Sequence, residues 1–115
     1  MDNESARAFC LSFPHATEDV QWGDDLLFRI GNKIFAVIAL NPAASLRICF
    51  KTTPEKFAEL IECEDILPAP YMARNHWVAL VRWDALPAAE LKRMLRASYE
   101  MIKAKLPKKL QATFI

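Results

Sequence analysis

His76 is the side chain in this sequence best suited to proton transfer. It closes a segment without periodicity, beside Arg74 and Trp77, and an imidazole in such a place can act as a general base. A base also needs a partner within reach, and no serine or cysteine lies in a recognisable nucleophile motif with it. A histidine that anchors the segment by hydrogen bonding is the favoured interpretation.

The other residue types that bind metals or cofactors are sparse and scattered. The three cysteines contain no CxxC pair, so they predict neither a disulfide framework nor a zinc site; they are Cys10, Cys49 and Cys63. His15 has no ligand spacing to His76 or to any cysteine, and the glycines, Gly23 and Gly31, are too isolated to cradle a phosphate. The sequence indicates no metal site and no cofactor.

The basic residues gather toward the C-terminus. Residues 1–30 hold two basic and six acidic residues, whereas residues 86–115 hold seven basic and two acidic residues in a chain of net charge +1. Part of the C-terminal excess offsets a helix dipole. The remainder extends past Pro107 and suggests an anionic partner, although a solvated helix face is the plainer alternative.

Length and composition bound the architecture that must position these groups. The chain has 115 residues, of which 53% are hydrophobic and 25% charged, which is typical of one folded globular domain spanning 1–115. Met1 is followed by Asp2 and Glu4 rather than by a basic and apolar leader. Together with the unpaired cysteines, this predicts a cytoplasmic protein.

The hydrophobic periodicity predicts three helices and five strands. Helices are expected over 3–13, from Thr53 to about Cys63, and from Pro87 to Leu106, where Pro107 ends the last one. Alternation predicts four sequential strands between Asp19 and Lys51, with a Gly31-Asn32 turn, and a further strand over His76–Trp83. Residues 64–75 show no period and are expected to be irregular.

The order α-β-β-β-β-α-β-α predicts an α+β fold of two layers. An antiparallel sheet would carry the helices on one face and leave its other face open to water or to a partner. Arg29, Arg47, Lys51, His76 and Arg82 fall on strand positions that could project from the open face, where they would bind phosphates. The alternative is that they are the polar residues that any wet sheet face requires.

Two further residue groups have both a structural and a functional interpretation. Trp77 and Trp83 share strand parity and could stack nucleic-acid bases, but core packing is the plainer expectation for a central strand. The carboxylates Glu18, Asp19, Asp24 and Asp25 cluster around the first strand and turn. They are expected to be turn and edge-strand residues that resist edge-to-edge pairing.

Several short stretches together resemble the MmcQ/YjbR-like family. They are Trp22-Gly23-Asp24, residues 28–36, Lys51-Thr52-Thr53-Pro54, residues 70–78 and Ser98-Tyr99 with the basic segment 105–109. The most specific are Pro70-Tyr71-Met72 followed by His76-Trp77, and Ser98-Tyr99 with its basic tail. The resemblance implies an α+β fold similar to the frataxin-like or CyaY-like class, a bacterial cytoplasmic setting and DNA binding, with no catalytic residue set.

The leading functional hypothesis is a small non-enzymatic module that binds DNA or another polyanion. Its expected nucleic-acid-binding residues are Lys51, Arg74, His76, Lys105, Lys108 and Lys109. The alternative is a protein-interaction or adaptor domain, which a contiguous apolar surface would favour. The third hypothesis is the His76-centred enzyme, which a pocket enclosing His76 beside another titrating group would favour.

Overall fold

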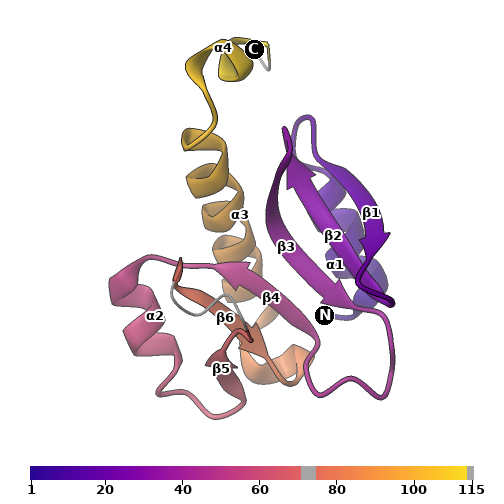
Figure 1. Cartoon of the computed structure of the whole chain (residues 1–115). Helices are drawn as coiled ribbons and strands as arrows, with labels where there is room; N and C mark the ends of the chain where they lie inside the picture. Colours follow the sequence, from indigo (N-terminus) through magenta and orange to yellow (C-terminus); the bar gives the residue numbers. More distant parts are fainter. Residues whose placement is uncertain (71–74, 114–115) are drawn as a thin grey trace.

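The structure is a computed structural model that describes residues 1–70 and 75–113. Its elements, in chain order, are α1 (Asn3–Leu11), β1 (Thr17–Gln21), β2 (Asp25–Ile30), β3 (Lys33–Ala39), β4 (Ile48–Lys51), α2 (Pro54–Leu60), β5 (Ile66–Pro68), β6 (Trp77–Leu80), the 3-10 helix η2 (Trp83–Ala85), α3 (Ala88–Ala104) and α4 (Lys108–Ala112). Within the described residues the six strands form one antiparallel sheet in the order β1-β2-β3-β4-β6-β5 (Figure 1). The predicted α+β fold class is confirmed.

Local signals in the sequence place the first two helices. Asp2 caps α1, because its carboxylate accepts a hydrogen bond from the Ser5 amide at 2.8 Å. Thr53 caps α2 in the same way, accepting from the Lys56 amide at 3.2 Å, and Pro54 occupies the first helical position. Both helix starts are therefore where the sequence predicts them.

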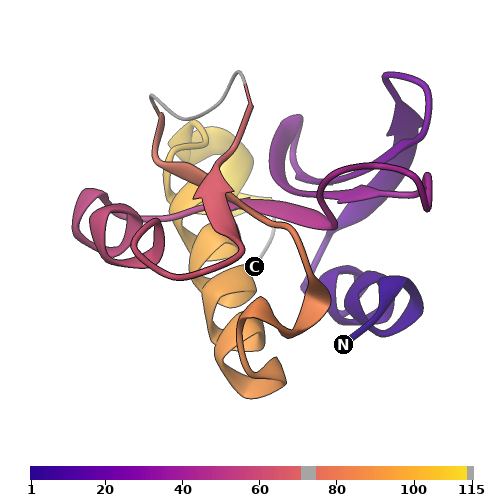
Figure 2. The same ribbon diagram turned by 90° about the horizontal axis from the view of Figure 1, so that it is seen from below.

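The main core lies between the sheet and the helices α1 and α3, which Figure 2 shows on one side of the sheet. Strand residues of one parity, including Phe28 and Phe50, face this side and are fully buried. Phe13, Phe35 and Tyr99 form an aromatic cluster there, with the rings of Phe13 and Tyr99 stacked 4.7 Å apart. The Tyr99 hydroxyl donates to the Pro14 carbonyl at 2.7 Å, which ties α3 to the end of α1.

Ser98 joins β3 to β4 where the two strands separate. Their pairing extends from Ile38 opposite Ile48 to Ala36 opposite Phe50. Beyond that point the Ser98 hydroxyl accepts from the Lys51 amide at 3.0 Å and donates to the Phe35 carbonyl at 2.6 Å. A buried side chain of α3 thus takes the place of the next backbone rung.

Three details differ from the sequence predictions. The segment predicted to be irregular contains β5, an edge strand that tolerates Pro68 and is too short to show a period. The strand predicted over His76–Trp83 ends at Leu80, and Trp83 lies in η2. The chain after Pro107 is helical in α4, because a proline that ends one helix can also begin the next.

Gly31 and Gly23 give a matched pair of substitutions. Both have left-handed backbones, with φ of 64° and 86°. A Cβ at Gly31 would lie 3.1 Å from Leu110 and 3.2 Å from Leu106, whereas nothing lies within 4 Å of one at Gly23. We expect Gly31→Ala to lower the free energy of unfolding by about 1 to 3 kcal/mol, more than Gly23→Ala. Backbone strain affects both variants, but only at Gly31 does the added Cβ also crowd neighbouring side chains. Urea denaturation of both variants measures this, and an equal loss would contradict it.

Candidate functional site

Lys51 and Lys105 are brought together from β4 and from the C-cap of α3. Lys51 is only 8% exposed, and its ammonium donates to the Asn75 carbonyl at 2.6 Å. Burial lowers the pKa of Lys51, and the neighbouring Lys105 ammonium lowers it further. Among residues 1–70 and 75–113, neither lysine has a carboxylate partner. Two cations are thus held side by side without a neutralising anion.

His76 helps to fix this arrangement through its backbone. Its carbonyl accepts hydrogen bonds from the Thr52 amide at 2.9 Å and the Thr52 hydroxyl at 2.6 Å. The residue has a left-handed φ of 63°, and its ring packs edge-on against Phe57 at 5.6 Å between centroids. These contacts anchor the turn from which the Asn75 carbonyl reaches Lys51.

Lys108 and Lys109 continue the basic surface onto α4. Both are exposed, and they follow Lys105 within four residues. The dipole explanation suits Lys103 and Lys105, which lie at the C-terminal end of α3. It does not suit Lys108, which begins α4 at the end where cations are unfavourable. Lys51, Lys105, Lys108 and Lys109 are referred to below as the lysine cluster.

Arg74, which the sequence adds to these residues, lies outside the described residues. The structure therefore brings Lys51 and Lys105 into one neighbourhood, with the His76 backbone beside them, and places Lys108 and Lys109 on the next helix. Charge at the C-terminus was visible in the sequence. The meeting of Lys51 with Lys105 was not.

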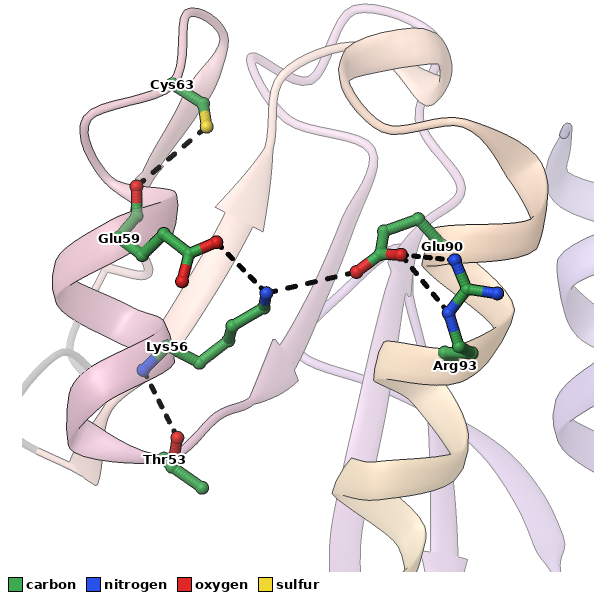
Figure 3. Close-up of polar contacts among 6 residues, drawn as sticks. All are labelled: Thr53, Lys56, Glu59, Cys63, Glu90 and Arg93. Atoms are coloured by element: carbon green, nitrogen blue, oxygen red, sulfur yellow. Dashed lines mark hydrogen bonds and ion pairs between the residues drawn. The ribbon is translucent and has the colours of Figure 1, made fainter.

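Several other cations of the described residues have partners. Figure 3 shows Lys56 between two carboxylates, 3.1 Å from Glu59 and 3.9 Å from Glu90, and Arg93 also bound to Glu90. These contacts link α2 to α3. On the remaining surface of α3, Lys92, Arg96 and Lys103 lie over the rings of Phe9, Phe13 and Tyr99 respectively. Their charges serve packing and local pairing, unlike those of the lysine cluster.

The arginines predicted on the open sheet face are also engaged. Arg29 lies 3.5 Å from Asp19, and Arg47 donates to the Ala44 carbonyl. Arg82 lies beyond the end of β6 and pairs with Asp84 at 3.0 Å and with Asp65 at 3.5 Å. These arginines make local contacts, and phosphate binding by a basic sheet face stays a prediction.

The open face of the sheet also carries an apolar cluster. Its buried cluster consists of Leu27, Val37, Cys49, Ala69, Trp77 and Ala79. Trp77 is 5% exposed, which confirms core packing and leaves its ring unavailable for stacking on bases. The sequence signal for this arrangement was that the strand around Trp77 has apolar residues on both of its faces.

A hollow of about 720 Å³ lies beside this apolar cluster. It is lined by Trp22, Asp25, Val37, Ala39, Ala44, Ser45, Leu46, Cys49 and Pro70. The first of these, Trp22, is 61% exposed and has a left-handed φ of 55° on the β1–β2 turn. The small side chains of Ala39, Ala44 and Ser45 leave the space that a larger residue would fill. We call it the open-face hollow; sequence reasoning missed it, because its residues come from separate segments.

Two titratable groups line the open-face hollow. Burial raises the pKa of the Asp25 carboxyl, and the adjacent Asp24 raises it further. Burial also raises the pKa of the Cys49 thiol to about 12, with a smaller contribution from Asp25. Cys49 is therefore protonated at neutral pH and is not an activated nucleophile.

The part of the chain that the structure describes contains neither a cluster of metal-ligating side chains nor a membrane-spanning helix. No group of three or more His, Cys, Asp or Glu side chains there could hold a metal ion. No helix there is long and apolar enough to cross a bilayer.

The antiparallel order of the strands and the helices on one sheet face place this chain among the open-faced α+β proteins. The model of the YjbR family matches residues 11–101, and the chain belongs to the YjbR family. The resemblance found in the short sequence stretches is thereby confirmed. The likeness to the frataxin-like class and the cytoplasmic location stay predictions.

Two solved structures have the same fold. A protein of Deinococcus radiodurans described as having a DUF419 domain is 25% identical, with a TM-score of 0.87, and the match covers 98% of this chain and 87% of that one. A protein from Pseudomonas syringae, 21% identical, has the same fold with a TM-score of 0.72, over 89% of this chain and 99% of that one. Among curated proteins, none matches this chain.

Proposed function

We propose that the chain is a non-enzymatic binding module whose ligand is DNA or a similar polyanion, bound at the lysine cluster. The observation that carries this proposal is the packing of Lys51 against Lys105 without a carboxylate partner in the described residues. Like charges held together repel, and a phosphate oxygen between them relieves that repulsion. Each phosphate neutralised also releases condensed counterions, which favours binding at low salt.

The distribution of the other charges supports the same surface. Most arginines of the described residues are in ion pairs or lie over aromatic rings, so they have less charge to offer to a distant anion. Lys108 and Lys109 extend the cluster without a structural partner of their own in the described residues. A surface of this kind binds phosphates without reading base sequence.

The non-enzymatic part of the proposal is supported by the state of the possible nucleophiles and of His76. Burial raises the pKa of Cys10 and of Cys49 to about 12 in each case. His76 lines neither the open-face hollow nor the smaller hollow of about 220 Å³ between α2 and α3, and its ring packs on Phe57. This packing contact suits an anchoring role for His76 rather than proton transfer.

Mobility shifts with mixed-sequence DNA, single- and double-stranded, across a salt series test the proposal. We expect the logarithm of affinity to fall linearly with the logarithm of salt concentration. The double variant Lys108→Glu, Lys109→Glu should bind about tenfold or more weakly at low salt and flatten the slope by about 2 units, equally for all sequences. The sequence independence follows because the lysines contact phosphates only.

The matched control is Lys92→Glu with Arg93→Glu, which changes the net charge by the same amount. These residues are exposed near the start of α3, about 20 Å along the helix from Lys105. A smaller loss in the control supports the lysine cluster, and an equal loss in both variants contradicts it. If the wild-type protein retains no DNA even at low salt, the protein-interaction function takes its place.

A further inference from the structure

The open-face hollow has the dimensions of a small-molecule site. Its volume of about 720 Å³ falls in the range of about 300 to 1,000 Å³ that is usual for ligand pockets. Its floor is formed by Val37 and Cys49 of the buried open-face cluster, and α1 and α3 lie on the opposite side of the sheet. No described helix covers it.

One charged side chain, Asp25, is aimed at this apolar surface. It is half-buried at the start of β2, and it lies close enough to Cys49 to influence that thiol. Within residues 1–70 and 75–113, its carboxylate has no hydrogen bond or ion pair to a side chain. Partial desolvation without a partner is unfavourable for a carboxylate, so a cation placed beside it would be stabilised.

Trp22 provides a second group suited to a cation. Its ring is the most exposed large apolar side chain of the described residues, at 61%, and it lines the same hollow as Asp25. The residue sits on the turn between β1 and β2 in a left-handed conformation, which is unfavourable for a tryptophan. An aromatic face beside a carboxylate binds ammonium groups through the ring quadrupole as well as through charge.

The residues that line the hollow favour one class of ligand over the others. An anion would be repelled by Asp25 and by the adjacent Asp24. A neutral apolar compound would fill the space but would desolvate the Asp25 carboxylate further without pairing it. A compound with an apolar body and one ammonium group can make all of the contacts that the hollow offers. Its body packs on the apolar floor, and its ammonium group pairs with the Asp25 carboxylate and lies against the Trp22 ring.

We propose that the open-face hollow binds a small organic amine, with its apolar body against Val37 and Cys49 and its ammonium between Asp25 and Trp22. This site is separate from the lysine cluster, and it stands whether or not the protein binds DNA. It gives the chain one acidic, apolar ligand site on the sheet and one basic surface carried mostly by α3 and α4.

Calorimetric titration with three probes of one ring system tests the proposal. Tryptamine carries an ammonium group, tryptophol a hydroxyl and indole-3-acetate a carboxylate on the same indole body. We expect tryptamine to bind with a Kd of about 1 mM or tighter, and the other two about tenfold or more weakly. Equal binding of the three probes, or no binding of tryptamine at all, would overturn the proposal.

Variants locate the site. Asp25→Asn should weaken tryptamine binding about tenfold and leave tryptophol binding unchanged, whereas Asp24→Asn, at an exposed neighbouring carboxylate, should have a smaller effect. Tryptamine binding to Asp25→Asn as tight as to the wild type would overturn the role of the carboxylate.

A second pair of variants tests the location of the site without changing Asp25, in case Asp25→Asn weakens binding by disturbing the fold. Ala44 lines the hollow, whereas the adjacent Ala43 is exposed and does not. Ala44→Trp should fill the space and abolish tryptamine binding, and Ala43→Trp should leave it unchanged. Binding that persists in Ala44→Trp would place tryptamine elsewhere on the protein and overturn the assignment. Loss of binding in both variants would show that the effect is not specific to the hollow, which would also overturn the assignment.

Discussion

Leu95→Ala is expected to lower the free energy of unfolding by about 2 to 5 kcal/mol. Leu95 is fully buried in the middle of α3, on the face that packs against the sheet. Truncation removes apolar surface from the core and leaves a cavity that the rigid β3 and β4 strands fill only in part. Denaturant melts of the wild type and the variant measure the difference.

Glu100→Ala is the control for this substitution. Glu100 lies on the exposed side of the same helix, and alanine is an excellent helix former, so the change should stay within about 0.5 kcal/mol. A loss below about 0.5 kcal/mol for Leu95→Ala would show that a different face of α3 packs on the sheet.

The period of α3 made this face predictable from the sequence. Leu91, Leu95, Ser98, Ile102 and Leu106 recur at helical spacing, and all five are buried in the structure. The alternation in β2 and β3 is equally local, and so are the caps of α1 and α2. Features set by neighbours three or four residues apart were therefore predicted well.

The candidate sites depend on contacts between distant segments, which no local pattern reports. Lys51 and Lys105 are 54 positions apart in the sequence, and they meet because β4 lies beside the C-terminal end of α3. The open-face hollow likewise needs the register of β2, β3 and β4 to bring Asp25, Val37 and Cys49 onto one face. Sequence reasoning identified the basic lysines, but it could not identify the space beside Asp25.

The two candidate sites are formed by different parts of the chain. The acidic N-terminal strands carry the open-face hollow, and the basic C-terminal helices carry most of the lysine cluster. The two sites share no residue, and β1 and β2 form one edge of the sheet while β4 leads toward α2 (Figure 1). A polyanion at the lysine cluster and an ammonium compound in the hollow need not compete for the same residues.

Ser98→Ala is expected to destabilise the protein by at least about 2 kcal/mol, although it removes only one oxygen atom. The buried hydroxyl accepts from the Lys51 amide and donates to the Phe35 carbonyl. Without it, a buried donor and a buried acceptor both lose their partner, and each loss costs about 1 to 3 kcal/mol. Denaturant melts measure the total, and hydrogen exchange at the Lys51 amide, which should become faster, reports the local effect.

Ser12→Ala separates this bridging role from the general effect of losing a serine hydroxyl. The Ser12 hydroxyl also bonds a backbone carbonyl, that of Phe9 at 2.5 Å, but it is exposed, so water can replace it and the change should stay within about 0.5 kcal/mol. Equal small losses for Ser12→Ala and Ser98→Ala would mean that β3 and β4 hold together without the serine. A large loss at Ser98 with faster exchange at Lys51 would show that α3 sets the spacing of the two strands, and with it the position of the lysine that meets Lys105.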